Sequence, residues 1–119
     1  MALSIKQKLG KTVMGGEIIS RILQAEGVTK AFGIADGTYW GTFGTLRDYG
    51  IDIIGPRHEA SAIFMAMGYH AMTGKVQVAI GAPGPGQANL LPAAITAAQE
   101  HIPVIIFGAR RQHAVDTAV

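Results

Sequence analysis

The amino-acid sequence predicts an α/β fold in which a doubly wound, mostly parallel sheet carries helices on both faces. Three observations lead to this prediction. Four short apolar segments have the length and composition of buried strands, and segments with apolar residues at helical spacing lie between them. Glycine-containing turns separate the two kinds of segment. Because strands that alternate with helices pair in parallel through right-handed crossovers, the four strands are expected in one sheet.

Length and composition limit the chain to one domain with a dense core. The chain has 119 residues, of which 49% are hydrophobic and 15% charged, and its mean hydropathy is +0.28. Because it lacks a continuous apolar run of about 18 residues, this composition indicates packing against a partner and not a membrane span. The formal net charge of +2 is too small and too dispersed to indicate a nucleic-acid surface.

Several kinds of chemistry lack candidate residues. The absence of cysteine excludes disulfides and thiolate metal sites and fits a reducing cytoplasm. The histidines fall on different predicted elements without ligand spacing, so no metal site is predicted. The serines lie in no elbow-like turn, which leaves no nucleophile of that type.

The first half of the chain predicts an extension, two helices and two strands. Residues 1–14 combine lysines with apolar residues and are interpreted as an N-terminal extension, because they lack the long apolar core of a secretory signal. A first helix is expected over residues 16–26, with Gly27 as its left-handed cap. The next elements are a strand over 28–34, a turn over 35–37, a helix over about 40–49 that ends at Gly50, and a strand over 51–54.

The central helix follows a turn formed by Arg57, His58 and Glu59, and it is expected to end at Gly74. Its apolar residues surround the whole circumference, so the helix is predicted to be buried on all sides. These residues are Ile63, Phe64, Met65, Met67, Tyr69 and Met72.

The last part of the chain predicts a strand, a helix and a strand. A third strand over 76–81 runs into a turn rich in glycine and proline over 81–87. The helix that follows is expected to begin with Asn89 as its N-cap, because this places Pro92 in the first turn, where a missing N–H has no cost. The helix is expected to end near His101, before a fourth strand over 103–108.

Unusual residues follow each predicted strand at its carboxyl end, which is where sheets of this kind bind ligands. They are Ile34-Ala35-Asp36-Gly37 after the first strand, Arg57-His58-Glu59 after the second, Pro83-Gly84-Pro85-Gly86 after the third and Arg110-Arg111 after the fourth. This convergence makes Glu59 a candidate site residue as well as a candidate capping residue.

Two features of this edge allow both a structural and a functional interpretation. Burial raises the pKa of the Glu59 carboxyl, whereas the helix N-terminus and Arg57 lower it, and the sequence leaves open which effect is larger. The loop over 81–87 is either a plain turn or a rigid turn that brings the backbone close to a flat ring. Its prolines remove N–H donors that a phosphate would need.

Five short motifs occur in order, each beside the expected element. They are Gly16-Glu17-Ile18-Ile19 with Ala25-Glu26-Gly27-Val28, Phe32-Gly33-Ile34, Arg57-His58-Glu59 with Phe64-Met65-Ala66 and Gly68-Tyr69, Gly84-Pro85-Gly86 with Asn89, and Ile102-Pro103-Val104. In this order they resemble the pyrimidine-binding (Pyr) domain of thiamine-diphosphate enzymes, in the superfamily of acetolactate synthase, pyruvate oxidase, benzoylformate decarboxylase and 2-hydroxyacyl-CoA lyase. The resemblance covers roughly residues 15–108. It implies that residues 15–119 form a Pyr domain that is incomplete at its C-terminal end.

The resemblance implies roles for several residues. In that family a glutamate after the second strand hydrogen-bonds N1′ of the cofactor's aminopyrimidine and so favours the imino tautomer, whose nitrogen removes the thiazolium C2 proton to give the ylid. The resemblance places Glu59 in this catalytic role. It also implies that Ile34, Ala35, Pro85 and Asn89 border thiamine diphosphate. The implied activity is cleavage or formation of C–C bonds in 2-oxo acids or 2-hydroxyacyl compounds.

The resemblance further implies that the chain holds half of a site. In that family a separate PP domain binds the diphosphate and Mg²⁺ through a Gly-Asp-Gly…Asn motif, which this sequence lacks. The cofactor lies between the Pyr domain of one subunit and the PP domain of another. The implied partners are therefore a PP-domain-bearing chain or segment, in a homo- or hetero-oligomer, and a small-molecule substrate.

Three residues depart from the family pattern. Ala35 stands where the family usually has proline, and Pro83 where it usually has serine or threonine. Asp36 is also atypical and is a candidate to face the substrate. The substrate side of the site is therefore expected to differ.

Two other interpretations remain open at this point. A non-catalytic α/β interaction or regulatory module would keep the Pyr fold without the chemistry, and the departures at Ala35 and Pro83 favour it. A flavodoxin-like nucleotide binder would bind flavin or nucleotide as an isolated chain, but no acidic pocket or phosphate loop supports it.

Overall fold

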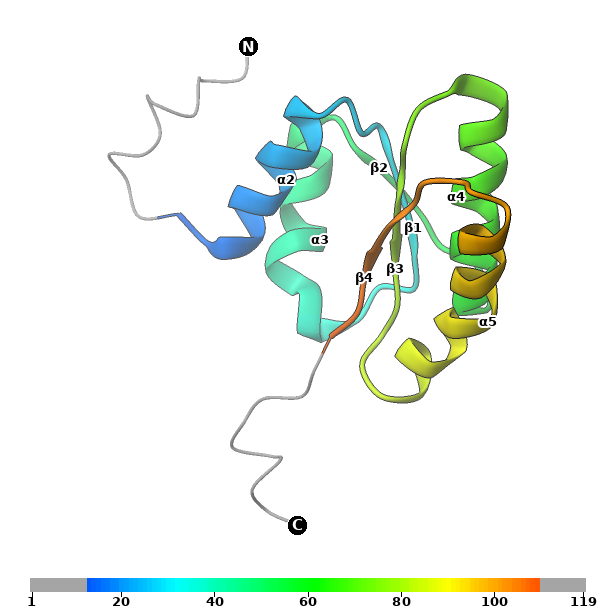
Figure 1. Cartoon of the computed structure of the whole chain (residues 1–119). Coiled ribbons are helices and arrows are strands. Elements are labelled where there is room, and N and C mark those ends of the chain that lie inside the picture. Colours follow the sequence, from blue (N-terminus) through cyan, green and yellow to red (C-terminus); the bar gives the residue numbers. More distant parts are fainter. Residues whose placement is uncertain (1–12, 110–119) are drawn as a thin grey trace.

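A computed structural model describes residues 13–109 of the chain (Figure 1). The sheet is wholly parallel and has the strand order β2-β1-β3-β4. Its strands are β1 (Lys30–Gly33), β2 (Asp52–Ile54), β3 (Val78–Ile80) and β4 (Ile105–Phe107). Most of the predicted extension and the Arg110-Arg111 pair lie outside the described residues.

Helices cover both faces of the sheet, which confirms the predicted doubly wound fold (Figure 1). One face carries α2 (Gly15–Ala25) and α3 (Trp40–Leu46), with the short 3-10 turns η1 (Gly37–Tyr39) and η2 (Arg47–Tyr49) on either side of α3. The other face carries α4 (Glu59–Thr73) and α5 (Pro85–Gln99). None of the helices in the described part of the chain has the length and apolar character needed to cross a membrane.

Each face of the sheet has its own apolar core, because successive strand residues point to opposite faces. Phe32 and Ala79 belong to the cluster beneath α4 and α5. Ala31, Val78 and Ile80 belong to the cluster beneath α2 and α3. All five side chains are buried, so the central strands β1 and β3 connect the two layers.

The predicted glycine caps are confirmed. Gly27, Gly50 and Gly74 follow the helical segments with φ angles of 82°, 73° and 70°. A left-handed residue at this position ends a helix at little cost when it has no β-carbon. The chain then turns into the next strand or loop.

The start of α5 differs from the prediction. The helix begins at Pro85 and not at Asn89, so Asn89 lies in the second turn and does not cap the helix. Proline suits the first helical position, because its ring fixes φ there and its missing N–H is not needed. Pro92 therefore lies inside the helix, where it leaves the carbonyl of Ala88 without its helical donor. Both residues are exposed, so water can reach this carbonyl.

The prediction that α4 is buried on all sides is wrong for the single chain. Ile63 and Met67 lie in the core, but Phe64 is 48% and Met72 86% exposed. The helix contacts the sheet and α5 with one side only. Its other side carries exposed apolar residues, and α5 also carries exposed apolar residues. The exposed apolar residues of the two helices are Phe64, Met65, Met72, Leu91 and Ile95.

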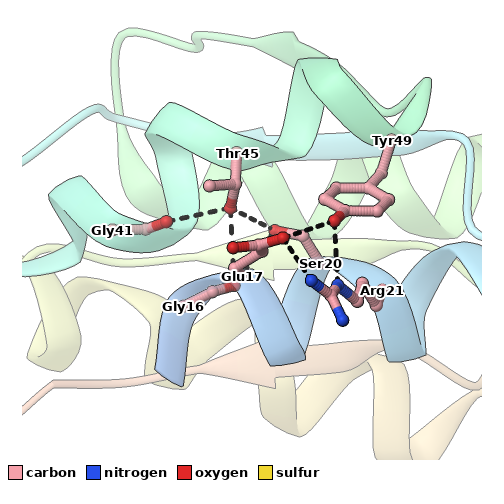
Figure 2. A network of polar contacts seen from close by, with 7 residues as sticks. All are labelled: Gly16, Glu17, Ser20, Arg21, Gly41, Thr45 and Tyr49. Carbon is pink, nitrogen blue, oxygen red and sulfur yellow. Dashed lines mark hydrogen bonds and ion pairs between the residues drawn. The ribbon is translucent and has the colours of Figure 1, made fainter. Parts of the chain in front are cut away.

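A polar network joins α2 to α3 and η2 on the opposite face of the sheet (Figure 2). Glu17 Oε1 accepts hydrogen bonds from Arg21 Nη2 at 2.5 Å and from the Tyr49 hydroxyl at 2.6 Å. Arg21 Nε donates to the Tyr49 hydroxyl at 2.8 Å, and the hydroxyls of Ser20 and Thr45 lie 2.8 Å apart. Because Arg21 is only 6% exposed, its charge needs these partners. The network therefore holds the two helices in one relative position.

The backbone of α2 approaches that of α3 closely at Gly16. A β-carbon built on Gly16 would lie 2.3 Å from the carbonyl carbon of Gly41 and 2.4 Å from the nitrogen of Thr42. Both contacts are to backbone atoms, which cannot move aside as a flexible side chain can. The packing of α2 on α3 therefore requires glycine at this position.

Gly16→Ala should lower the free energy of unfolding by about 1–3 kcal/mol, because the added methyl group forces the helices apart. The control is Gly44→Ala in α3, where a built β-carbon meets nothing within 4 Å. This second change should raise the free energy of unfolding by about 0.5–1 kcal/mol. Urea denaturation of the two variants measures both effects. Equal stability of the two variants would contradict the close approach.

Candidate functional site

The carboxyl ends of the strands meet at one edge of the sheet, together with the N-termini of α4 and α5. Gly33 at the end of β1 pairs with Ile80 at the end of β3. A β-carbon built on Gly55, just after β2, would lie 3.8 Å from the carbonyl oxygen of Gly33. The N–H of Gly81 donates to the carbonyl of Phe107 in β4 at 3.1 Å. The loops after all four strands are thereby brought to the same edge.

Glu59 is the first residue of α4 and is 9% exposed. The residue before it, His58, is the N-cap, and its Nδ1 accepts the N–H of Ala60 at 3.2 Å. The carboxylate of Glu59 accepts a hydrogen bond from its own backbone N–H. His58 therefore provides the side-chain cap, and one oxygen of Glu59 remains available to a neighbouring element.

The first turns of α5 supply that neighbour. Asn89 Nδ2 donates a hydrogen bond to Glu59 Oε2 at 3.0 Å. A β-carbon built on Gly86 would lie 2.7 Å from Glu59 Oε1 and 2.9 Å from the β-carbon of Ala82. Any side chain at position 86 would consequently displace the carboxylate. The carboxyl group is thus held between the beginnings of two packed helices.

These contacts settle the direction of the pKa shift that the sequence left open. The hydrogen bond from Asn89 lowers the pKa of the Glu59 carboxyl most, followed by the bond from its own backbone N–H. Burial acts in the opposite direction but is outweighed. Arg57, the neighbouring charge considered from the sequence, has an exposed side chain.

The other predicted site residues lie at the same edge. Ile34 is half-buried and Ala35 exposed, directly after β1, and Pro85 is exposed at the start of α5. Asp36, the candidate to face the substrate, caps η1, because its Oδ1 accepts the N–H of Thr38 at 2.8 Å. Hydrogen bonds from Thr38 lower the pKa of Asp36. Asp36 therefore stabilises the local turn.

A shallow cleft of about 470 Å³ lies between the start of α2 and the η1–α3 segment. It is lined by Met14, Gly15, Gly16, Ile19, Thr38, Tyr39, Trp40, Gly41 and Thr42, none of which carries a charge. Burial raises the pKa of the Tyr39 phenol.

Among residues 13–109, no three His, Cys, Asp or Glu side chains gather as metal ligands do. The carboxylate of Glu59 therefore remains the candidate for proton chemistry.

The sequence placed Gly86 at this edge without predicting its contact with Glu59, and it predicted Asn89 as a helix cap and not as a residue of the second turn. The close approach of Gly86 to a carboxylate depends on tertiary packing, which no local pattern reveals. A signal for Asn89 was present, because proline after glycine commonly marks the first residue of a helix. With α5 started at Pro85, Asn89 falls one turn into the helix, where its side chain reaches α4.

The parallel sheet and the residues at the carboxyl ends of its strands agree with a known protein family. Residues 13–117 match the family described as thiamine pyrophosphate enzyme, N-terminal TPP binding domain. The chain belongs to this family, which confirms the resemblance inferred from its motifs.

Particular relatives are acetolactate synthases. The chain is 42% identical over 94 residues to the catabolic acetolactate synthase of Raoultella terrigena and 40% identical over 91 residues to the acetolactate synthase of Bacillus subtilis (strain 168). It is 35% identical over 91 residues to the large subunit of acetolactate synthase isozyme 2 of Escherichia coli (strain K12). These alignments cover 79%, 76% and 76% of this chain, but only 17%, 16% and 17% of the relatives. The chain thus spans about a sixth of their length.

Glu59 should make the stability of the chain sensitive to acid. The lowered pKa of its carboxyl means that the ionised form stabilises the fold above the ordinary glutamate pKa of about 4.3, and that this contribution is lost as the pH falls through the folded-state pKa. Urea denaturation between about pH 5 and pH 3 should therefore show a smaller loss of stability in Glu59→Gln than in the wild type.

The control for this experiment is Glu100→Gln, because Glu100 is an exposed carboxylate just beyond α5. This variant should lose stability with the same pH dependence as the wild type. A wild-type slope in Glu59→Gln would show that the buried carboxylate adds nothing to the fold.

Proposed function

We propose that this chain supplies the pyrimidine-binding half of a thiamine-diphosphate-dependent active site that breaks or forms C–C bonds in 2-oxo acids or 2-hydroxyacyl compounds. One observation carries the proposal, which is the buried and hydrogen-bonded carboxylate of Glu59 at the carboxyl edge of the sheet. Membership of the thiamine pyrophosphate enzyme family supplies the cofactor class. Similarity to acetolactate synthases supports the substrate class.

Glu59 is proposed as the catalytic residue. Its carboxylate would take up a proton as the aminopyrimidine ring binds, share this proton with N1′ and recover it during turnover, and its burial would keep water from the proton. When bound, thiamine diphosphate supplies a nucleophilic thiazolium carbon that adds to carbonyl groups. The chain's task is therefore to hold the ring and to move one proton at Glu59.

The residues around Glu59 suit a flat heterocycle. The carboxyl group offers a proton or an acceptor, Asn89 offers an amide, and Gly86 leaves the space that the carboxyl group occupies. Ile34, Ala35, Pro85 and Asn89 are proposed to border the ring. None of these residues is cationic, and no cationic side chain of residues 13–109 is proposed to bind the diphosphate. Another domain is therefore needed to bind it.

The diphosphate and its Mg²⁺ are proposed to be held by a PP domain in another segment or chain. The chain spans about a sixth of the length of its relatives. The exposed apolar residues of α4 and α5 provide a surface for such a partner, because exposed apolar patches of this kind mark interaction sites. The assembly is proposed to be a homo- or hetero-oligomer, with residues 15–119 as its Pyr domain.

Glu59→Gln should slow exchange of the cofactor C2 proton by about 10²–10⁴-fold in the enzyme assembled with its PP domain, because glutamine cannot give up a proton at this position. Quenched-flow hydrogen–deuterium exchange followed by NMR measures this rate. Glutamine keeps the shape of the side chain, so thiamine diphosphate should still bind.

Glu100→Gln is the matched control and should leave the exchange rate unchanged, because this carboxylate lies at the far end of α5. A wild-type exchange rate in Glu59→Gln would overturn the proposed role.

A further inference from the structure

Asn89 and Glu59 meet where α5 packs against α4. They are 30 positions apart in the sequence, and Asn89 Nδ2 lies 3.0 Å from Glu59 Oε2. Glu59 is buried and Asn89 is half-buried, so little water competes for this bond. A hydrogen bond to an ionised acceptor is about twice as strong as one between neutral groups. The contact is therefore strong enough to influence the chemistry of the carboxyl group.

Helix α5 contacts both oxygens of the Glu59 carboxylate and so restricts its orientation. Asn89 donates to Oε2, and the backbone of Gly86 lies so close to Oε1 that a β-carbon there would be 2.7 Å away. Both residues belong to the first two turns of α5 and so move together. A group that is fixed by one rigid element keeps its direction as the ligand arrives.

The chemistry of an amide suits the carboxylate that remains after proton transfer. The N–H of Asn89 stabilises the ionised form of Glu59 and so lowers the pKa of this carboxyl group. An amide does not itself take up or release a proton near neutral pH. Asn89 therefore assists departure of the proton without competing for it.

We propose that Asn89 is a positioning residue that holds the Glu59 carboxyl group in the direction of the ring nitrogen and stabilises its negative charge once the proton has left. This inference rests on the proposed function. It goes beyond contact with the cofactor, because it gives Asn89 an effect exerted through Glu59.

Few other ionisable groups lie near Glu59, so the effect of Asn89 on the pKa of this carboxyl group can be measured separately. Beside Glu59 itself, the ionisable neighbour is His58, the N-cap of α4, whose Nδ1 accepts the N–H of Ala60. Asn89 and Gly86, which α5 supplies, do not titrate. On the strands beneath α4, Lys30 lies at the amino end of β1, away from this edge, and forms an ion pair with Asp52.

The test replaces Asn89 by leucine, which removes the amide but keeps most of the volume. In the enzyme assembled with its PP domain, Asn89→Leu should slow C2 proton exchange by about 10- to 100-fold, the worth of a hydrogen bond to a charged group. It should also move the alkaline limb of the pH–rate profile, along which Glu59 loses its proton, to higher pH. Asn89→Ala should change both quantities in the same direction. Gln99→Leu, an exposed amide at the end of the same helix, should change neither.

A double-mutant cycle separates a positioning role from a structural one. In the Glu59→Gln background, Asn89→Leu should have no further effect on the exchange rate, because no charge is left to stabilise. Carbon-13 NMR of the Glu59 carboxyl in this chain should show a higher pKa in Asn89→Leu than in the wild type.

The possible results distinguish failure of the role proposed for Asn89 from failure of the role proposed for Glu59. An unchanged exchange rate in Asn89→Leu, an equal effect in both backgrounds, or an unchanged pKa of Glu59 would overturn the inference alone. A wild-type exchange rate in Glu59→Gln would overturn the proposed function itself.

Discussion

The carboxylate of Glu59 is a charge that the fold removes from water and then stabilises with hydrogen bonds. Such a charge destabilises the fold if it lacks partners, so its neighbours are constrained. Its own backbone N–H and Asn89 supply the partners, and Gly86 leaves the space that the carboxylate occupies. These requirements determine how α5 must begin. With Pro85 as its first residue, the helix presents both Gly86 and Asn89 to the start of α4.

The remainder of the fold positions this contact and the loop beside it. Two separate cores, one on each face of the parallel sheet, hold β1 and β3 at its centre. The loop with Ile34 and Ala35 leaves β1 and leads through η1 into α3. On that face, Arg21 and Glu17 bind Tyr49 and so tie η2 to α2, and the hydroxyls of Ser20 and Thr45 tie α3 to α2 (Figure 2). A polar network away from Glu59 therefore stabilises the segment that is proposed to border the cofactor.

Much of the architecture could be predicted because local patterns and the tertiary fold agree. Apolar runs, helical spacing and glycine caps such as Gly74 predicted the four strands and the α-helices, with ends that differ by a few residues, but not the 3-10 turns η1 and η2. Other features depend on contacts between distant segments. Gln77 looks like the polar position of an alternating strand, yet it is buried and accepts the N–H groups of Thr29 and Lys30. The exposed side of α4 could not be predicted either, since an apolar helix surface has the same pattern whether its own chain or a partner covers it.

The central claim is that Glu59 meets a ring nitrogen of a cofactor whose diphosphate another domain holds. Nitrogen-15 NMR of thiamine diphosphate labelled at N1′, bound to the assembled enzyme, tests this contact most directly, because the resonance of a ring nitrogen moves when the nitrogen is protonated or hydrogen-bonded. Contact between Glu59 and N1′ should displace the N1′ resonance from that of the free cofactor, and Glu59→Gln should reduce this displacement. An N1′ resonance at the free position in the wild type, or the same displacement in Glu59→Gln, would contradict it.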